Sequence, residues 1–154
     1  MNLKGFKFSL EAPLKVKGIH KTELEIKLAK AKNEMDDHKR TLDRLSMESD
    51  GIQSRLGALL STGIRAADLI EVNKYLGFLG DKIVDSQHRY HKASDKFTEL
   101  RNSLIGLMNE IDMLEKLRDQ HMGEYLKGMQ KKEERDLEER INYQTFMRGG
   151  KIYG

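Results

Sequence analysis

Apolar residues recur at alternating gaps of three and four along residues 69–114, and this is the strongest pattern in the chain. Thirteen of the fourteen positions in the series are apolar or aromatic, and only Ser86 breaks it. A mean spacing of about 3.5 residues is typical of a helix that buries one stripe against a partner helix. The series comprises Leu69, Val72, Leu76, Leu79, Ile83, Ser86, Tyr90, Ala93, Phe97, Leu100, Leu104, Leu107, Ile111 and Leu114.

A second series with the same spacing occupies the preceding half of the chain. It begins weakly, because Lys17 and Lys21 take two of its positions, and from Leu24 on nine of its eleven positions are apolar. Pro13 suits the first turn of this helix, because an N–H group at that position has no acceptor within the helix, and Ser9 is a candidate cap. The members are Leu10, Leu14, Lys17, Lys21, Leu24, Leu28, Ala31, Met35, His38, Leu42, Leu45, Ser49, Ile52, Leu56 and Leu59.

Residues 61–68 separate the two series and have the composition of a turn. Gly63 can take the left-handed conformation that ends a helix, and Asp68 followed by Glu71 has the spacing of a capping box. A link this short makes neighbouring helices antiparallel. We therefore predict an all-α fold, a long antiparallel two-helix coiled-coil hairpin forming one domain. The expected elements are a helix at about 10–61, a turn at about 62–67, a longer helix at about 68–146 and a frayed tail at 147–154.

The two series also predict a register. If Leu59 meets Leu69, facing residue numbers add to about 128, which places Ala31 near Phe97 and Met35 near Ala93. His38 then faces Tyr90 in a polar layer that helps to fix the register. A slip of one heptad keeps the same pattern and remains an alternative.

The second helix is expected to extend beyond the first. In the predicted register Leu10 lies beside Arg118, so residues after about 118 have no partner within the hairpin. The helical pattern continues there up to Gly149-Gly150, where we expect order to end. This overhang has an apolar stripe of its own, formed by Met122, Leu126, Met129, Leu137 and Ile141.

Composition agrees with a thin seam rather than a thick core. Charged residues make up 34% of the chain and aromatic residues 6%, with no Trp and one Pro. The absence of Cys excludes disulfides and thiol catalysis. No apolar run approaches the roughly 18 to 20 residues that cross a bilayer, and no secretion signal is present, so we expect a cytoplasmic protein without membrane insertion. A net charge of +3 is too mild to require a nucleic-acid partner.

Catalytic patterns are missing from the sequence. His88 and His91 lie one helical turn apart, but no acidic or Cys residue completes a ligand set, so we interpret them as structural or surface residues and predict no metal. The glycines are scattered and follow no strand, which argues against a phosphate-binding loop. We expect a binding protein without a cofactor.

Three surfaces are candidates for partners. Near the turn, Ile70, Phe78 and Val84 lie off the seam with Tyr75 beside it, and outward apolar groups at helical spacing indicate docking. The second surface is the Met- and Leu-containing stripe of the overhang. The third is residues 1–32, with eight Lys against three Glu. Isolated exposed side chains, fraying and an ordinary solvated charge run are the respective structural alternatives.

Specific stretches resemble a known family. The opening Phe6-Lys7-Phe8-Ser9-Leu10-Glu11, followed by Leu14-Lys15-Val16-Lys17, is similar to the start of the FliJ family of bacterial flagellar export proteins. Tyr75-Leu76 with Leu79, and the charged helix from Glu124-Tyr125 to Glu139-Arg140, also resemble that family. Stalk proteins of virulence type III secretion systems share the same layout.

The resemblance implies a non-enzymatic stalk similar to the central stalk of rotary ATPases. Expected partners are the hexameric flagellar export ATPase, the cytoplasmic domain of the membrane export gate protein and export chaperones. The expected location is the inner face of the cell membrane at the flagellar base, with peripheral association. The implied ATPase-binding residues are Phe6, Phe8, Leu10, Leu14, Tyr125, Leu126 and Met129. The implied export-gate-binding residues are Tyr75, Leu76, Phe78, Leu79 and Ile83.

Four other hypotheses stay open at this point. A virulence-system stalk fits the same pattern. A nucleic-acid-binding coiled coil would use the basic amino-terminal helix, and its affinity would fall steeply with salt. A structural spacer or homodimer would pair the overhangs of two chains, and an enzyme is the last alternative.

Overall fold

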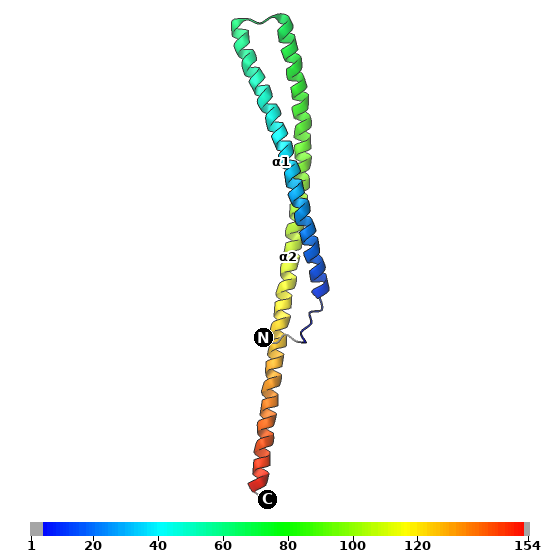
Figure 1. Ribbon diagram of the computed structural model, residues 1–154, viewed down its shortest axis with the longest axis vertical. Coiled ribbons are helices and arrows are strands. Elements are labelled where there is room, and N and C mark those ends of the chain that lie inside the picture. Colours follow the sequence, from blue (N-terminus) through cyan, green and yellow to red (C-terminus); the bar gives the residue numbers. More distant parts are fainter. Residues whose placement is uncertain (1–4, 153–154) are drawn as a thin grey trace. The chain divides into compact units, whose positions relative to one another are not determined.

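The computed structural model describes residues 5–152, with side chains as far as residue 149. Two helices make up this part of the chain, α1 (Glu11–Thr62, 52 residues) and α2 (Ala66–Ile152, 87 residues), as Figure 1 shows. Residues 63–65 link them, and no strand occurs in the described range. The predicted all-α helical hairpin is confirmed.

Local chemistry explains where α1 begins and ends. Its first turn contains Glu11, whose carboxylate suits the positive end of the helix dipole, and Pro13, as expected. The helix ends at Gly63, which has a φ of +104°. The Gly63 N–H donates to the Leu59 carbonyl at 2.8 Å and so satisfies one of the last free carbonyls of the helix.

The bounds of α2 differ from the prediction at both ends. The helix begins at Ala66, so Asp68 lies in its first turn instead of capping it. The Leu69 N–H donates to the Arg65 carbonyl at 3.0 Å. At the other end α2 continues to Ile152, beyond the expected end at about 146, while 153–154 lie outside the described residues and the fraying of the tail stays a prediction. Gly149-Gly150 does not stop the helix, because glycine costs only about 1 kcal/mol relative to alanine and no proline follows.

The described chain divides into two units. One contains residues 20–107, and the other contains residues 1–19 together with 108–154. Each helix contributes to both units, and the single domain expected from the sequence stays a prediction.

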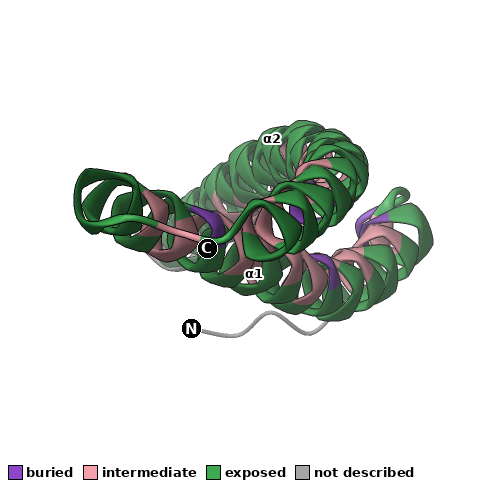
Figure 2. Ribbon diagram, turned by 90° about the horizontal axis from the view of Figure 1, so that it is seen from above, coloured by how far each residue is buried: buried purple, intermediate pink, exposed green. Residues whose placement is uncertain are grey.

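The seam of the 20–107 unit follows the two heptad series. Every α2 position in the series from Leu69 to Leu107 is buried or half-buried, and so is every α1 position from Lys21 to Leu56. Figure 2 shows how few residues are fully buried. Leu79 is 2% exposed and Ala31 is 3% exposed. The seam is therefore only one row of side chains wide on each helix.

The two serines that interrupt the series are part of the seam. Ser49 and Ser86 are both buried, and in the predicted register each faces a leucine of the other helix. The Ser49 Oγ accepts a hydrogen bond from the Gln53 Nε2 at 3.5 Å. A polar residue at a core position therefore does not break either helix.

Contacts between the helices support the predicted register. In the 20–107 unit, Lys96 Nζ lies 3.9 Å from Glu34 Oε2, and Lys39 Nζ lies 5.7 Å from the Tyr90 ring centroid. These residue numbers add to 130 and 129, closer to 128 than to the 121 or 135 of a one-heptad slip, whereas those of the Tyr75–Glu48 hydrogen bond nearer the turn add to 123. Leu10 and Leu59 differ from the expectation, because both are exposed at the two ends of the α1 series. The facing of Ala31 and Phe97 stays a prediction.

The seam predicts a large cost for truncating its most buried residue. We expect Leu79→Ala to lower the free energy of unfolding by about 2 kcal/mol or more, since it leaves a cavity in a one-row seam. Val84→Ala, at an exposed position of the same helix, should change it by less than about 0.5 kcal/mol. Urea unfolding followed by circular dichroism measures both, and equal costs would contradict the burial of Leu79.

Two glycines should respond in opposite directions to alanine. A Cβ built on Gly77, in the interior of α2, meets no atom within 4 Å, so Gly77→Ala should stabilise the chain by about 1 kcal/mol. Gly63→Ala should destabilise it by about 1 kcal/mol or more, because its φ of +104° strains any L side chain. The same unfolding experiment compares the two variants.

Candidate functional site

The amino-terminal segment packs against α2 within the 1–19 and 108–154 unit. We call residues 5–10 the amino-terminal strap. The Phe6 and Tyr125 ring centroids lie 5.5 Å apart, and the Phe8 ring meets the edge of the His121 ring at 5.6 Å. Phe8 is only 8% exposed. Aromatic pairs in these tilted geometries are favourable beyond the area that they bury.

Gly5 allows the strap to approach the helix closely. Its φ is +97°, and a Cβ built on it would lie 2.9 Å from the Tyr125 hydroxyl oxygen. A larger residue would therefore be strained in its backbone and would also collide with Tyr125.

Two ion pairs join α1 and α2 beside the strap. Lys17 Nζ lies 2.7 Å from Glu110 Oε2, and Arg118 Nη1 lies 3.7 Å from Glu11 Oε1. Both pairs match the predicted register. They also explain how Lys17 occupies a seam position, because its ammonium group reaches a carboxylate of the opposite helix while its stem covers apolar surface.

The strap corrects the predicted extent of the overhang. Residues after about 118 were expected to have no partner within the chain, but the strap reaches Tyr125. Met122 lines a cleft of about 600 Å³ with Phe6, Lys7 and Phe8. Every residue from 130 to 148 is exposed, so the part of α2 without intrachain cover begins near residue 130.

The implied ATPase-binding residues therefore fall into three groups. Phe8 and Leu14 are buried against the chain itself, and Leu10 is exposed. Phe6, Tyr125, Leu126 and Met129 are half-buried. The structure brings Phe6 and Tyr125 together as ring neighbours, and the role of all seven in binding stays a prediction.

The exposed part of α2 carries more apolar residues than the sequence pattern predicted. Leu137 and Ile141 were expected there and are 58% and 51% exposed. Tyr143, Phe146 and Met147 are exposed as well and were missed, because we expected order to end close to them. Their spacing of three and four residues was the signal that could have identified them.

A second candidate surface lies near the turn, in the 20–107 unit. The Tyr75 and Phe78 rings stack with centroids 6.2 Å apart, and Lys82 Nζ lies 5.5 Å from the Phe78 ring centroid. The Tyr75 hydroxyl donates a hydrogen bond to Glu48 Oε1 of α1. This contact places an aromatic pair on the outside of the hairpin and ties it to both helices. We call Tyr75, Phe78 and Lys82 the tip cluster.

The implied gate-binding residues divide between this surface and the seam. Tyr75 and Phe78 are exposed, whereas Leu76 and Ile83 are half-buried and Leu79 is buried. Ile70 and Val84, which were expected to face outward, are exposed. A partner that leaves the seam closed can therefore contact the first two most fully and cannot reach Leu79, and the role of all five stays a prediction.

An apolar groove adjoins the tip cluster. It has a volume of about 400 Å³ and is lined mainly by Ile52, Leu56, Leu59, Val72 and Tyr75. These are seam positions on both helices, apart from Tyr75. The seam is therefore incompletely closed near the turn, which agrees with the exposure of Leu59.

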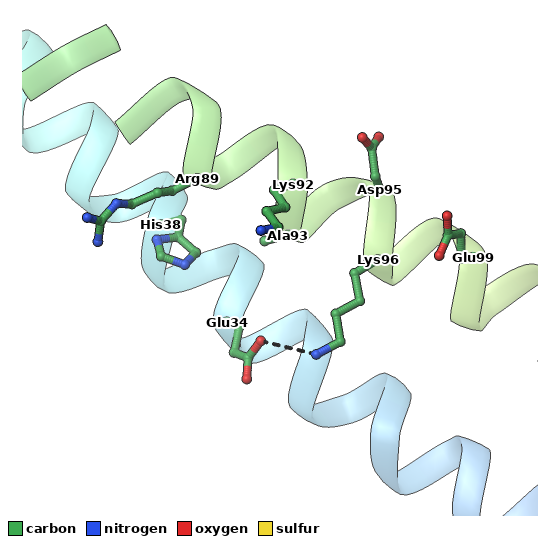
Figure 3. A pocket seen from close by; sticks show the side chains of 8 residues that line it. All are labelled: Glu34, His38, Arg89, Lys92, Ala93, Asp95, Lys96 and Glu99. Carbon is green, nitrogen blue, oxygen red and sulfur yellow. Dashed lines mark ion pairs between the residues drawn. The ribbon is translucent and has the colours of Figure 1, made fainter. Parts of the chain in front are cut away.

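A further groove, shown in Figure 3, lies between α1 and α2 and has a volume of about 470 Å³. Acidic and basic side chains alternate around it, and the Lys96–Glu34 ion pair crosses it. Opposite charges that neutralise one another offer no single-sign site for a charged ligand. The lining residues are Glu34, His38, Arg89, Lys92, Ala93, Asp95, Lys96 and Glu99.

Residues 5–152 show neither a metal-binding cluster nor a membrane-spanning helix. No group of three or more His, Asp or Glu side chains there is placed to hold a metal ion. His88 and His91 are both exposed. No helix in that range combines the length and apolarity needed to cross a lipid bilayer.

The Tyr75–Glu48 contact predicts an alkaline pH dependence. The hydrogen bond to Glu48, then desolvation and the Glu48 charge, raises the pKa of Tyr75 above its usual value of 10.0. The folded state thus favours the protonated phenol, so this stabilisation is fully present below about pH 10 and is lost as pH rises through the folded-state pKa. We expect the thermal midpoint to fall less steeply above pH 10 in Tyr75→Phe than in wild type. Identical slopes would show that the contact is absent in solution.

Comparison with known proteins identifies the family. The sequence pattern of the family described as "Flagellar FliJ protein" matches residues 6–151, nearly the whole chain. No curated protein and no solved structure gives a significant match. The match begins at Phe6, in the strap, and ends close to the end of α2, so it covers both candidate surfaces. The chain therefore belongs to the flagellar FliJ protein family, whose members are components of the flagellar export apparatus.

Proposed function

We propose that this chain is a non-enzymatic stalk that binds the hexameric flagellar export ATPase through its terminal unit and the membrane export gate through its tip. In this role it also contacts export chaperones, and it works on the cytoplasmic side of the membrane at the flagellar base. The match to a flagellar family favours this system over a virulence secretion system.

One observation carries the ATPase proposal. Residues 130–148 form a helix in which every residue is exposed, yet Leu137, Ile141, Tyr143 and Phe146 are apolar or aromatic. Exposed apolar groups at helical spacing, surrounded by charge, are typical of a helix that docks into a groove of another protein. The half-buried Tyr125, Leu126 and Met129 lie on the same helix and extend that surface.

A stalk of this kind needs no bond-making chemistry. A two-helix rod at the centre of a hexamer contacts the six subunits unequally, so it breaks their symmetry and senses which of them holds nucleotide. Its affinity must stay modest, because a rod that binds one subunit too tightly cannot respond to the next. Scattered apolar contacts among charged residues meet that demand better than a continuous apolar face.

The tip cluster supports the gate proposal. Tyr75 and Phe78 present an exposed stacked pair, and aromatic side chains are common anchors of interfaces. The neighbouring apolar groove offers space for a side chain of the partner. Its volume lies at the lower end of the range for pockets that accept a ligand or an anchoring side chain.

No observation favours the nucleic-acid alternative. Part of the positive charge of the amino-terminal helix is already paired, since Lys17 contacts Glu110 and Lys21 contacts Glu25 at 3.7 Å. The stretch therefore offers fewer free cations for phosphates than its composition indicates.

Charge introduced on the exposed helix should weaken ATPase binding. We expect the double variant Leu137→Asp and Ile141→Asp to lower the affinity for the hexameric export ATPase on the order of tenfold or more, since it buries two carboxylates in an apolar contact. Co-purification and titration of the ATPase measure the loss. Met113→Asp, at a position that is 70% exposed on α2, is the matched control and should bind as wild type does. Equal binding by all three proteins would remove the proposed ATPase surface.

A separate pair of variants tests the gate surface. Phe78 and Val84 are 54% and 53% exposed, but only Phe78 belongs to the tip cluster. We expect Phe78→Asp to weaken binding to the cytoplasmic domain of the export gate several-fold and to leave ATPase binding unchanged, whereas Val84→Asp should affect neither. If Val84→Asp alone weakened binding to the export gate, the gate contact would lie on another face of the hairpin.

A further inference from the structure

We infer that the amino-terminal strap is a releasable cover, which hides one half of the apolar stripe of α2 and must move before the ATPase can occupy the whole stripe. The inference rests on the proposed ATPase function for the identity of the partner. The cover itself is a property of this chain and can be tested without any partner.

The covered and exposed residues share one face of α2, in two groups that the polar residues 130–136 separate. Met122, Leu126, Met129, Leu137 and Ile141 follow helical spacing along α2. Leu137 and Ile141 are exposed, whereas Met122, Leu126 and Met129 are half-buried. Among the three, Met122 lines the cleft beneath Phe6 and Phe8. A partner that docks on the exposed half of this stripe therefore meets the strap when it extends towards Met122.

The strap is held in a way that permits release. The backbone hydrogen bonds of the strap that lie outside the helices run to α1, from the Glu11 N–H to the Phe8 carbonyl at 3.1 Å and from the Leu14 N–H to the Leu10 carbonyl at 3.0 Å. A helix satisfies its own backbone, so α2 offers the strap side chains alone. Phe6 and Phe8 make the ring contacts, and among the described residues no backbone–backbone hydrogen bond joins residues 5–10 to α2.

Release would also free residues that the family resemblance assigns to the ATPase. Phe8 is buried in the closed arrangement, and Phe6 and Tyr125 cover one another. None of these rings can present its full face to a partner until the strap leaves. The closed form therefore keeps apolar surface out of water when the partner is absent, and it makes docking compete with an intrachain contact.

A cleavable cross-link between the strap and α2 tests whether the strap is released. Lys7 and Asp119 line the same cleft, and the chain contains no Cys, so Lys7→Cys with Asp119→Cys gives a unique pair that spares the contacting rings. A bis-maleimide with an internal disulfide locks the strap, and a reductant releases it in the same protein. The matched control, Glu34→Cys with Lys96→Cys, places an equivalent link between α1 and α2 away from the strap.

The rate at which hydrogen peroxide oxidises Met122 measures how well the strap covers this residue when no partner is present. We expect Met122 to oxidise several-fold more slowly in the locked protein than after cleavage, while the exposed Met113 oxidises equally in both. In the uncross-linked chain the Met122 rate should exceed the locked rate, because the strap opens. Equal Met122 rates in the locked and released proteins would overturn the inference.

Affinity for the hexameric export ATPase measures whether the closed strap hinders docking. We expect several-fold weaker binding by the locked protein than by the released one, with no effect of the control link. Equal binding by both forms would overturn the gating role. Failure of both forms to bind, with Met122 still protected by the lock, would instead refute the proposed ATPase function and leave the cover standing.

Discussion

A single stripe of apolar side chains on each helix, spaced three and four residues apart, is the constraint on which the structure depends. Each helix can cover the other along one row only, so little of either surface is removed from water. In the described residues the buried side chains are Phe8, Leu14, Ala31, Ser49, Leu79 and Ser86. Many small contacts along the two helices therefore supply the stability of the fold.

The polar contacts beside the seam fix the register of the two helices more than they stabilise the fold. The Lys17–Glu110 and Lys96–Glu34 pairs lie at the solvent-exposed edge, where an ion pair contributes about 0–1 kcal/mol. Because each pair joins residues at one register only, a slip would separate several of them at once. The seam thus provides the attraction between the helices, and the flanking charges select among its possible alignments.

A thin seam also leaves a large surface for partners, which suits a protein that connects other proteins. The tip cluster and residues 130–148 of α2 are two places where apolar or aromatic groups face outward. Both are built on helices, so their side chains are held at defined spacing without a partner. The strap adds a third feature, an apolar contact that the chain makes with itself beside the surface proposed for the ATPase.

The sequence by itself determined the two helices, the glycine that ends the first of them and the approximate register, because heptad spacing and a left-handed turn are local properties of the chain. It did not indicate that Phe6 and Phe8 fold back onto Tyr125 and His121, since a short segment without helical periodicity carries no signal for its destination. The heptad series did place Phe78 and Tyr75 off the seam and Leu79 within it, but it did not place the end of α2 beyond Gly149-Gly150. The contacts of the strap were decided by tertiary structure, because burial depends on which side chains of distant segments meet.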